Sequence, residues 1–140
     1  MRADEWDVKV FCRHPEDDPL QECPAETFLM DCPDSAAEDL FSIIDAVASA
    51  PPPQFTGGGM WEAMHGSMAG FYEARTRGPD RRLYRLFCIL DRDVPGLDRP
   101  SIVVICGLSK PVGEAMTASQ YESVRRLGAE YRKRLPRCVS

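Results

Sequence analysis

The sequence predicts an α+β fold in which a small antiparallel sheet carries helices before and after a three-strand meander. Three apolar segments rich in β-formers, 70–75, 82–90 and 101–106, are separated by turn-forming glycine, proline and aspartate residues. An apolar stripe with helical spacing precedes them at 36–48, and a second stripe follows from Thr117. The predicted order is therefore strand, two helices, three strands and a C-terminal helix.

The first predicted strand spans 6–12, where polar and apolar residues alternate. The next stretch, 13–25, holds three prolines and several acidic residues and is predicted to be an exposed loop. Residues 26–30 form a short helical or extended piece, and the polar pair at 34–35 is placed to cap the helix over 36–48. The apolar stripe of that helix consists of Leu40, Ile43, Ile44 and Val47.

A glycine-rich connection, 54–66, links this helix to the meander. Its triple glycine at 57–59 lacks the Gly-Lys-Ser/Thr ending of a phosphate-binding loop, so a flexible loop is predicted. After the meander, Thr117 and Gln120 form a capping-box pattern for a last helix that ends before Pro136. The apolar stripe of this last helix consists of Tyr121, Val124, Leu127 and Tyr131.

The alternation along each strand predicts which side chains share a face of the meander. Arg85 lies among apolar neighbours on one face of its strand, and Glu73 shares a face with Arg75. Lys110 follows the last strand, in a predicted loop just past Gly107. If the strands pair in sequence order, four side chains converge on one concave surface: Glu73, Arg75, Arg85 and Lys110. Three cations and one carboxylate suit a phosphodiester substrate.

At 140 residues with 44% apolar content, the chain is in the range of a single globular domain spanning 1–140. No apolar run is long enough to span a bilayer, and the start lacks the apolar core of a secretory signal, so the expected location is the cytoplasm. The six cysteines are then expected to be reduced thiols. They form no Cys-x-x-Cys pair and match no common zinc spacing, so neither a metal nor a cofactor is expected.

Charge is divided unevenly along the chain. Residues 1–56 carry thirteen acidic against three basic residues, whereas 57–140 carry nine acidic against fourteen basic residues. The basic second part suits a protein that binds a polyanion. A solvated acidic face that aids solubility explains the first part equally well.

Three blocks of the meander resemble a known family. They are Phe71-Tyr-Glu-Ala-Arg75, Leu83-Tyr-Arg-Leu-Phe87 and Val104-Ile-Cys-Gly-Leu-Ser-Lys110. In order and spacing they are similar to the aromatic-Glu-Leu-Arg, Tyr-Arg-aliphatic-aromatic and apolar-His-Gly-Phe-Lys-Lys series of RelE/ParE-superfamily toxins, in particular the HigB-like branch. The stretch from Thr27 to Asp45 also resembles the helix-loop-helix of these toxins.

The resemblance implies a RelE-like fold and a toxin of a type II toxin-antitoxin pair that cleaves mRNA in the ribosomal A site. In metal-independent RNases the 2′-hydroxyl of the RNA attacks the adjacent phosphorus, so the protein must aid proton loss and stabilise a charged phosphorane. Arg85 is expected to clamp the scissile phosphate, with Arg75 and Lys110 sharing its charge. Glu73 is a candidate general base, although neighbouring cations are expected to lower its pKa. The expected partners are mRNA on the ribosome and a cognate antitoxin of the helix-turn-helix type, with no membrane.

Two residues depart from the family pattern. Cys106 stands where the family often has histidine, which removes a candidate acid, and Ser109 stands where a lysine is typical. His65 is an alternative acid or base, although a lone loop histidine is usually solvated. For Arg85, the alternative is a structural ion pair with Glu73. Two other functions remain open: a non-enzymatic binder on the same fold, either a ParE-like gyrase inhibitor or an inactive toxin relative, and an unrelated α+β interaction domain.

Overall fold

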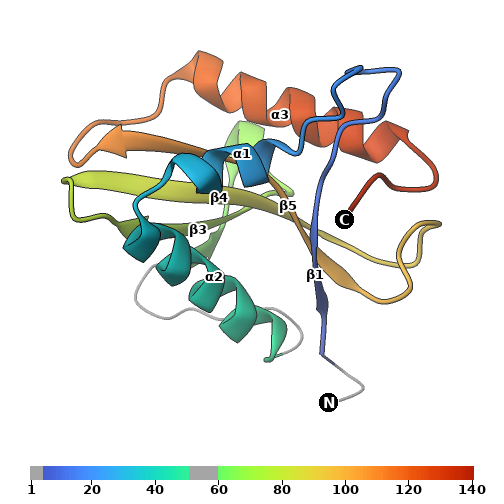
Figure 1. Ribbon diagram of the computed structural model, residues 1–140, viewed down its shortest axis with the longest axis horizontal. Coiled ribbons are helices and arrows are strands. Elements are labelled where there is room, and N and C mark those ends of the chain that lie inside the picture. The colour runs from blue at the N-terminus through green and yellow to red at the C-terminus, as the bar shows by residue number, and fades with distance from the viewer. Residues whose placement is uncertain (1–4, 51–59) are drawn as a thin grey trace.

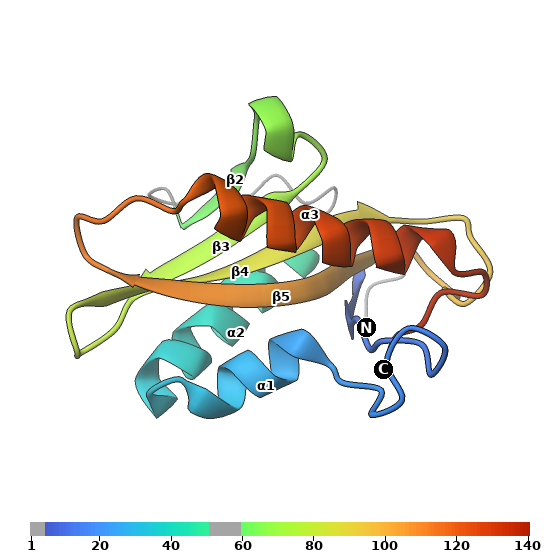
Figure 2. The ribbon, with the colours of Figure 1, turned by 90° about the horizontal axis from the view of Figure 1, so that it is seen from above.

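The computed structural model describes residues 5–50 and 60–140, which form a sheet with helices on both faces (Figures 1 and 2). The glycine-rich stretch 57–59 lies outside the described residues. In chain order the elements are β1 (Asp7–Val10), α1 (Pro24–Asp31), α2 (Asp34–Ala48), β2 (Trp61–Ala63), the 3-10 helix η1 (Gly66–Met68), β3 (Tyr72–Arg77), β4 (Arg82–Asp91), β5 (Ser101–Pro111) and α3 (Ala118–Lys133).

The sheet has five strands in the order β1-β5-β4-β3-β2. The α+β class and the antiparallel meander β3-β4-β5 are confirmed. The prediction of a wholly antiparallel sheet is wrong, because β1 pairs with β5 in parallel, with Asp7 opposite Ser101. The period-two pattern is the same for parallel and antiparallel strands, so it carries no information about direction. The short strand β2, which lies within the predicted 54–66 connection, adds an edge strand antiparallel to β3.

Two layers of helix cover the sheet, with α1 and α2 on one face and α3 on the other (Figure 2). Neighbouring strand residues point to opposite faces, so Leu86 packs in the core beneath α1 and α2, whereas Phe87 packs beneath α3. Leu40 of α2 and Tyr131 of α3 are fully buried in these two cores. Burial of each such side chain contributes roughly 1.5–3 kcal/mol relative to exposure, so the two apolar cores fix which face of each strand remains for polar groups.

The strand β5 is longer than its sequence suggests. It continues through Gly107 to Pro111, so the prediction of a loop at Lys110 is wrong: Lys110 lies on β5 opposite Leu83. Gly107 does not end the strand. Its lack of a side chain allows α1 to pack closely against β5. A Cβ at this position would overlap the ring of Phe28 from α1.

The helix starts follow two different patterns. The capping box of α3 is confirmed, since Gln120 N donates to Thr117 Oγ1 at 3.1 Å and Thr117 N donates to Gln120 Oε1 at 2.8 Å. The cap predicted for α2 at 34–35 is wrong. Pro33 occupies the N-cap position, and Asp34 lies in the first turn, where a carboxylate is favoured by the helix dipole. The short segment 26–30 lies within the helix α1.

The stretch 13–25 is tied to the rest of the molecule by a disulfide between Cys12 and Cys23. The prediction of six reduced thiols is wrong for this pair, while Cys32, Cys88, Cys106 and Cys138 are free. The bridge forms because the chain folds back on itself after β1, with Arg13 N donating to the carbonyl of Glu22 at 2.8 Å. A spacing of eleven residues does not reveal such a reversal.

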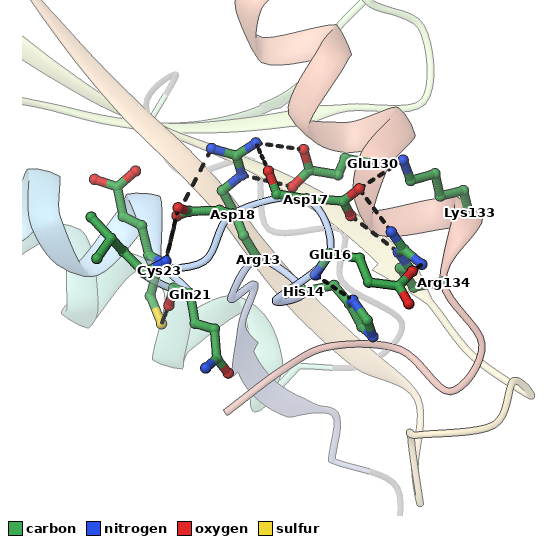
Figure 3. A network of polar contacts seen from close by, with 12 residues as sticks. Arg13, His14, Glu16, Asp17, Asp18, Gln21, Cys23, Glu130, Lys133 and Arg134 are labelled. Carbon is green, nitrogen blue, oxygen red and sulfur yellow. Dashed lines mark hydrogen bonds and ion pairs between the residues drawn. The ribbon is translucent and has the colours of Figure 1, made fainter.

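Ion pairs also fasten this loop to the C-terminal end of α3, as Figure 3 shows. Arg13 donates two hydrogen bonds to the carboxylate of Glu130, both at 2.9 Å. Arg134 donates to both carboxylate oxygens of Asp17, at 3.0 and 2.8 Å, and the ammonium of Lys133 lies 2.9 Å from the same carboxylate. These hydrogen bonds hold the pKa of Asp17 well below its usual range. The stretch 13–25, which was predicted to be an exposed loop, is therefore held against the end of α3 by ion pairs.

We expect reduction of the Cys12–Cys23 bridge to lower the free energy of unfolding by about 3 kcal/mol, because the bridge closes a short loop in the unfolded chain. Urea unfolding with and without a thiol reductant measures this difference. The variant C12S/C23S should match the reduced protein, whereas C138S, at a free cysteine, should retain the full effect of the reductant. An unfolding midpoint that does not respond to reductant would contradict the prediction.

Candidate functional site

The four polar residues singled out from the sequence lie on the sheet face that α3 covers in part. Arg75 of β3 is opposite Arg85 of β4, and Glu73 is opposite Phe87 in the next row. On the other side of β4, Lys110 of β5 is opposite Leu83. Because Phe87 packs in the core beneath α3, the same alternation directs Glu73, Arg75, Arg85 and Lys110 to that face.

Glu73 lies between two guanidinium groups. Its Oε1 is 3.5 Å from Arg75 Nη1, and its Oε2 is 3.5 Å from Arg85 Nε. The side chains of Glu73 and Arg85 are only 8% and 11% exposed, whereas that of Arg75 is 35% exposed. We call Glu73, Arg75 and Arg85 the Glu73 cluster. It joins a nearly buried ion pair to a guanidinium that solvent reaches.

One hydrogen-bond donor of Arg85 has no partner in the described part of the chain. Its Nη1 is buried and has no hydrogen-bond partner among residues 5–50 and 60–140. Leaving a buried donor unpaired typically destabilises a protein by about 1–3 kcal/mol, and more for a charged group, so such groups are rare and call for an explanation. An anionic ligand with oxygens to share would satisfy this donor.

The pKa of Glu73 is raised above its ordinary value. Burial is the largest cause, and it outweighs the lowering by Arg85 and Arg75, while Glu62 raises the pKa further. The two cations lower the pKa of Glu73 as expected, but the expected net decrease is wrong, because the prediction omitted burial. A carboxylate with a raised pKa is a better proton acceptor near neutral pH than an exposed glutamate.

We expect the Glu73 carboxyl to titrate above pH 4.5, the ordinary value for glutamate, in a carbon-13 NMR titration with Glu73→Gln used for assignment. A group whose pKa is raised by folding stabilises the folded state below its unfolded pKa, and this stabilisation is lost as the pH rises through its folded pKa. The stability advantage of wild type over Glu73→Gln should therefore decrease as the pH rises above 4.5. A titration midpoint at or below 4.5 would contradict the prediction.

The Glu73 cluster lies where the sheet extends past the first turn of α3. Figure 2 shows β3, β4 and β5 continuing beyond the start of this helix toward the β3–β4 turn. Tyr121, in the first turn, packs edge-on against Phe87 with ring centroids 6.4 Å apart. Arg85 and Leu83 follow on the same strand face, toward the open end of the sheet.

Two further charged residues belong to this surface and were not singled out from the sequence. Glu62 of β2 is opposite Glu73, and its Oε1 lies 3.3 Å from Arg75 Nη2. Arg77 shares the strand face of Arg75 and is exposed beside Leu83. Arg77 could have been found from the strand alternation, because residues 73, 75 and 77 are two apart and share one face of the strand. The signal for Glu62 was the apolar-polar-apolar run around it, which was too short to predict a strand.

The other candidate residues lie elsewhere or are buried. His65 is exposed beyond the end of β2 that points away from the β3–β4 turn, so the structure does not bring it to the Glu73 cluster. Cys106 lies in the core beneath α3, and burial raises the pKa of its thiol to about 12, so it stays protonated. Ser109 accepts hydrogen bonds from Arg82, both at 3.1 Å, and so positions another cation near the turn.

Lys110 adds charge to the surface without joining the Glu73 cluster directly. It is half-buried on β5, one row closer to the β3–β4 turn than Arg85. In the described part of the chain, no acidic side chain forms an ion pair with it. Together, Arg75, Arg85 and Lys110 form a surface that favours an anion with several oxygens.

Within 5–50 and 60–140, no three His, Cys, Asp or Glu side chains gather as metal ligands would. No helix in these ranges is both long and apolar enough to cross a bilayer. No family model, curated protein or solved structure matches the chain.

Proposed function

We propose that this chain is the toxin of a type II toxin-antitoxin pair, of the HigB-like branch of the RelE/ParE superfamily, and that it cleaves mRNA on the ribosome. The observation that carries the proposal is the Glu73 cluster. A nearly buried carboxylate with a raised pKa lies 3.5 Å from a guanidinium whose Nη1 has no described hydrogen-bond partner. Glu73 can accept a proton, and Arg85 can donate a hydrogen bond to a phosphate oxygen, which together suit the cleavage of a phosphodiester.

In the proposed reaction, Glu73 accepts the proton of the RNA 2′-hydroxyl. The 2′-oxygen then attacks the adjacent phosphorus, and the bond between phosphorus and the 5′-oxygen of the next nucleotide breaks. Arg85 Nη1 donates to a phosphorane oxygen, and Arg75 and Lys110 offset the remaining negative charge. Water at the open end of the surface protonates the leaving 5′-oxygen. The products are a 2′,3′-cyclic phosphate and a 5′-hydroxyl, and no metal or cofactor takes part.

The proposal includes a cellular setting. The toxin acts in the cytoplasm, where ribosomes present single-stranded mRNA, and a cognate antitoxin of the helix-turn-helix type keeps it inactive. Covering the Glu73 cluster would be sufficient for inhibition, because RNA must reach Arg85 from the open end of the sheet. The three sequence blocks that support this setting all lie in β3, β4 and β5 or directly beside them.

Induced expression in bacteria tests the proposal, with primer extension on a reporter mRNA as the second readout. Expression of wild type should arrest growth and cleave the reporter mRNA at positions in frame with its codons, whereas Arg85→Ala should do neither. Arg126→Ala, which removes an exposed arginine of α3 that pairs with the nearby Glu122, should behave as wild type. Growth without arrest under wild-type induction, with the protein accumulating in soluble form, would refute the toxin assignment.

A second candidate is a non-enzymatic binder on the same fold, such as a ParE-like gyrase inhibitor or an inactive toxin relative. One observation favours it: both arginines of the Glu73 cluster already have a carboxylate within 3.5 Å, as a purely structural ion-pair network would. Growth arrest without mRNA cleavage, retained in Arg85→Ala, would support this candidate over the nuclease.

A further inference from the structure

The helical layer formed by α1 and α2 is uniformly acidic. The sequence contains no lysine or arginine between Arg13 and Arg75. The two helices expose six carboxylates, and these belong to Glu26, Asp31, Asp34, Glu38, Asp39 and Asp45. The Glu73 cluster with its cations lies on the opposite face of the sheet. The molecule therefore has one face of negative charge and one with a cationic patch.

An apolar groove runs along α2 within this acidic layer. Its volume is about 350 Å³, and its lining residues are Asp39, Ser42, Ile43, Ala46, Met60 and Thr76. The α2 residues among them recur with a spacing of three to four, so the groove follows the helix for about 10 Å. Ile43, Ala46 and Met60 provide the apolar surface, and Asp39 contributes a carboxylate at its edge.

Large apolar side chains are exposed on the same two helices. Met30 of α1 is 85% exposed and Phe41 of α2 is 50% exposed. Phe41 lies between Glu38 and Asp45 on the outer side of α2, at helical spacings of three and four. Exposed apolar residues bordered by charges of one sign are typical of protein interaction sites.

We propose that this groove is the docking site for a cationic amphipathic segment of a partner protein. Apolar side chains of the segment would occupy the groove, and its lysine or arginine side chains would face Asp39 at the groove's edge and the other exposed carboxylates of α1 and α2. The six carboxylates would repel nucleic acid and anionic lipid, which leaves a basic polypeptide as the ligand class. The site does not depend on the proposed nuclease function, and both faces can be occupied at once.

Fluorescence anisotropy with three short labelled peptides tests the inference. The first is an amphipathic peptide of leucine and lysine, the second replaces lysine by glutamate, and the third replaces leucine by serine. We expect the leucine-lysine peptide to bind and the other two to bind at least about tenfold more weakly. Equal binding of the serine-lysine peptide would show attraction by charge alone and would overturn the proposal, as would no binding of the first peptide.

Two kinds of variant locate the site. Ala46→Trp fills the groove without changing the charge, at an exposed helix position, and should weaken peptide binding by about tenfold. Ser42→Trp repeats the test should Ala46→Trp lose its helical circular dichroism signal. Glu38→Lys/Asp45→Lys should weaken binding similarly. Its control is Asp98→Lys/Glu114→Lys, which makes the same change of charge at exposed positions outside α1 and α2.

The control variant should retain most of the affinity. If it loses as much as Glu38→Lys/Asp45→Lys, or if both tryptophan variants bind as wild type, the groove is not the site. Sedimentation of the protein alone addresses another occupant. A concentration-dependent dimer that Ala46→Trp abolishes would show that a second copy of the chain fills the groove, which would also overturn the proposal.

Discussion

Replacement of Arg85 by methionine is expected to lower the rate of RNA cleavage by about 10²- to 10³-fold, the effect typical of removing one donor to a developing oxyanion. Methionine keeps an unbranched apolar stem but lacks the guanidinium and offers no N–H group. The buried Nη1, which has no partner in the described part of the chain, is the donor that we expect the phosphorane to use. Single-turnover cleavage of a reporter mRNA on purified ribosomes measures the loss.

The stability of Arg85→Met must be measured together with its cleavage rate, because Arg85 and Glu73 form a nearly buried ion pair. Removing one partner of such a pair destabilises a protein by about 3–5 kcal/mol, and the raised pKa of Glu73 limits the loss by favouring its neutral form. The double variant Arg85→Met/Glu73→Gln should recover most of the stability and none of the cleavage. Recovery of cleavage in the double variant would show that neither side chain takes part in the chemistry and that Arg85→Met acts through stability alone.

Replacement of Arg137 by methionine is expected to lower the free energy of unfolding by about 3–5 kcal/mol. The carboxylate of Asp91 is buried and accepts hydrogen bonds from Tyr131 Oη at 2.7 Å and Arg137 Nε at 2.9 Å. The guanidinium of Arg137 also lies over the Tyr131 ring, 5.1 Å from its centroid. Without Arg137, the buried carboxylate of Asp91 loses the cation that pairs with it. Urea unfolding provides the measurement.

Two variants control for this effect. Arg126→Met breaks an ion pair whose partners are 75% and 52% exposed, so it should change stability by no more than about 0.5 kcal/mol. Asp91→Asn/Arg137→Met removes both charges and should be clearly more stable than Arg137→Met alone. A loss below about 1 kcal/mol in Arg137→Met would mean that Tyr131 and the backbone satisfy Asp91 without the arginine.

The elements that the sequence predicted well are those whose evidence is local. The strands β3 and β4 follow from alternation, and the capping box of α3 from two residues three apart. The parallel direction of β1 was not predictable in this way, because it depends on pairing with β5, a strand far away in the sequence. Nor was the bridge between Cys12 and Cys23, since it depends on how the loop folds against α3.

The candidate site shows the same division. The common face of Glu73, Arg75 and Arg85 followed from parity along two strands. The sign of the shift in the pKa of Glu73 did not, because burial by neighbouring elements decides it and a sequence lists only the charges. Lys110 was misplaced in a loop for a related reason. The glycine before it makes room for Phe28, a residue far away in the chain.

The pairing of β1 with β5 also determines when the sheet can be completed during synthesis. Asp7–Val10 leaves the ribosome early, but its partner residues 101–104 emerge only when most of the chain has been made. Until then β1 lacks its strand partner, and the core beneath α1 and α2 lacks the β5 residues Ile102 and Val104. Contacts between residues so distant in sequence slow folding and prolong the exposure of apolar surface. A nascent chain that stalls before residue 101 therefore presents an open strand edge and an apolar core that β5 has not yet completed, which are features that chaperones and proteases bind.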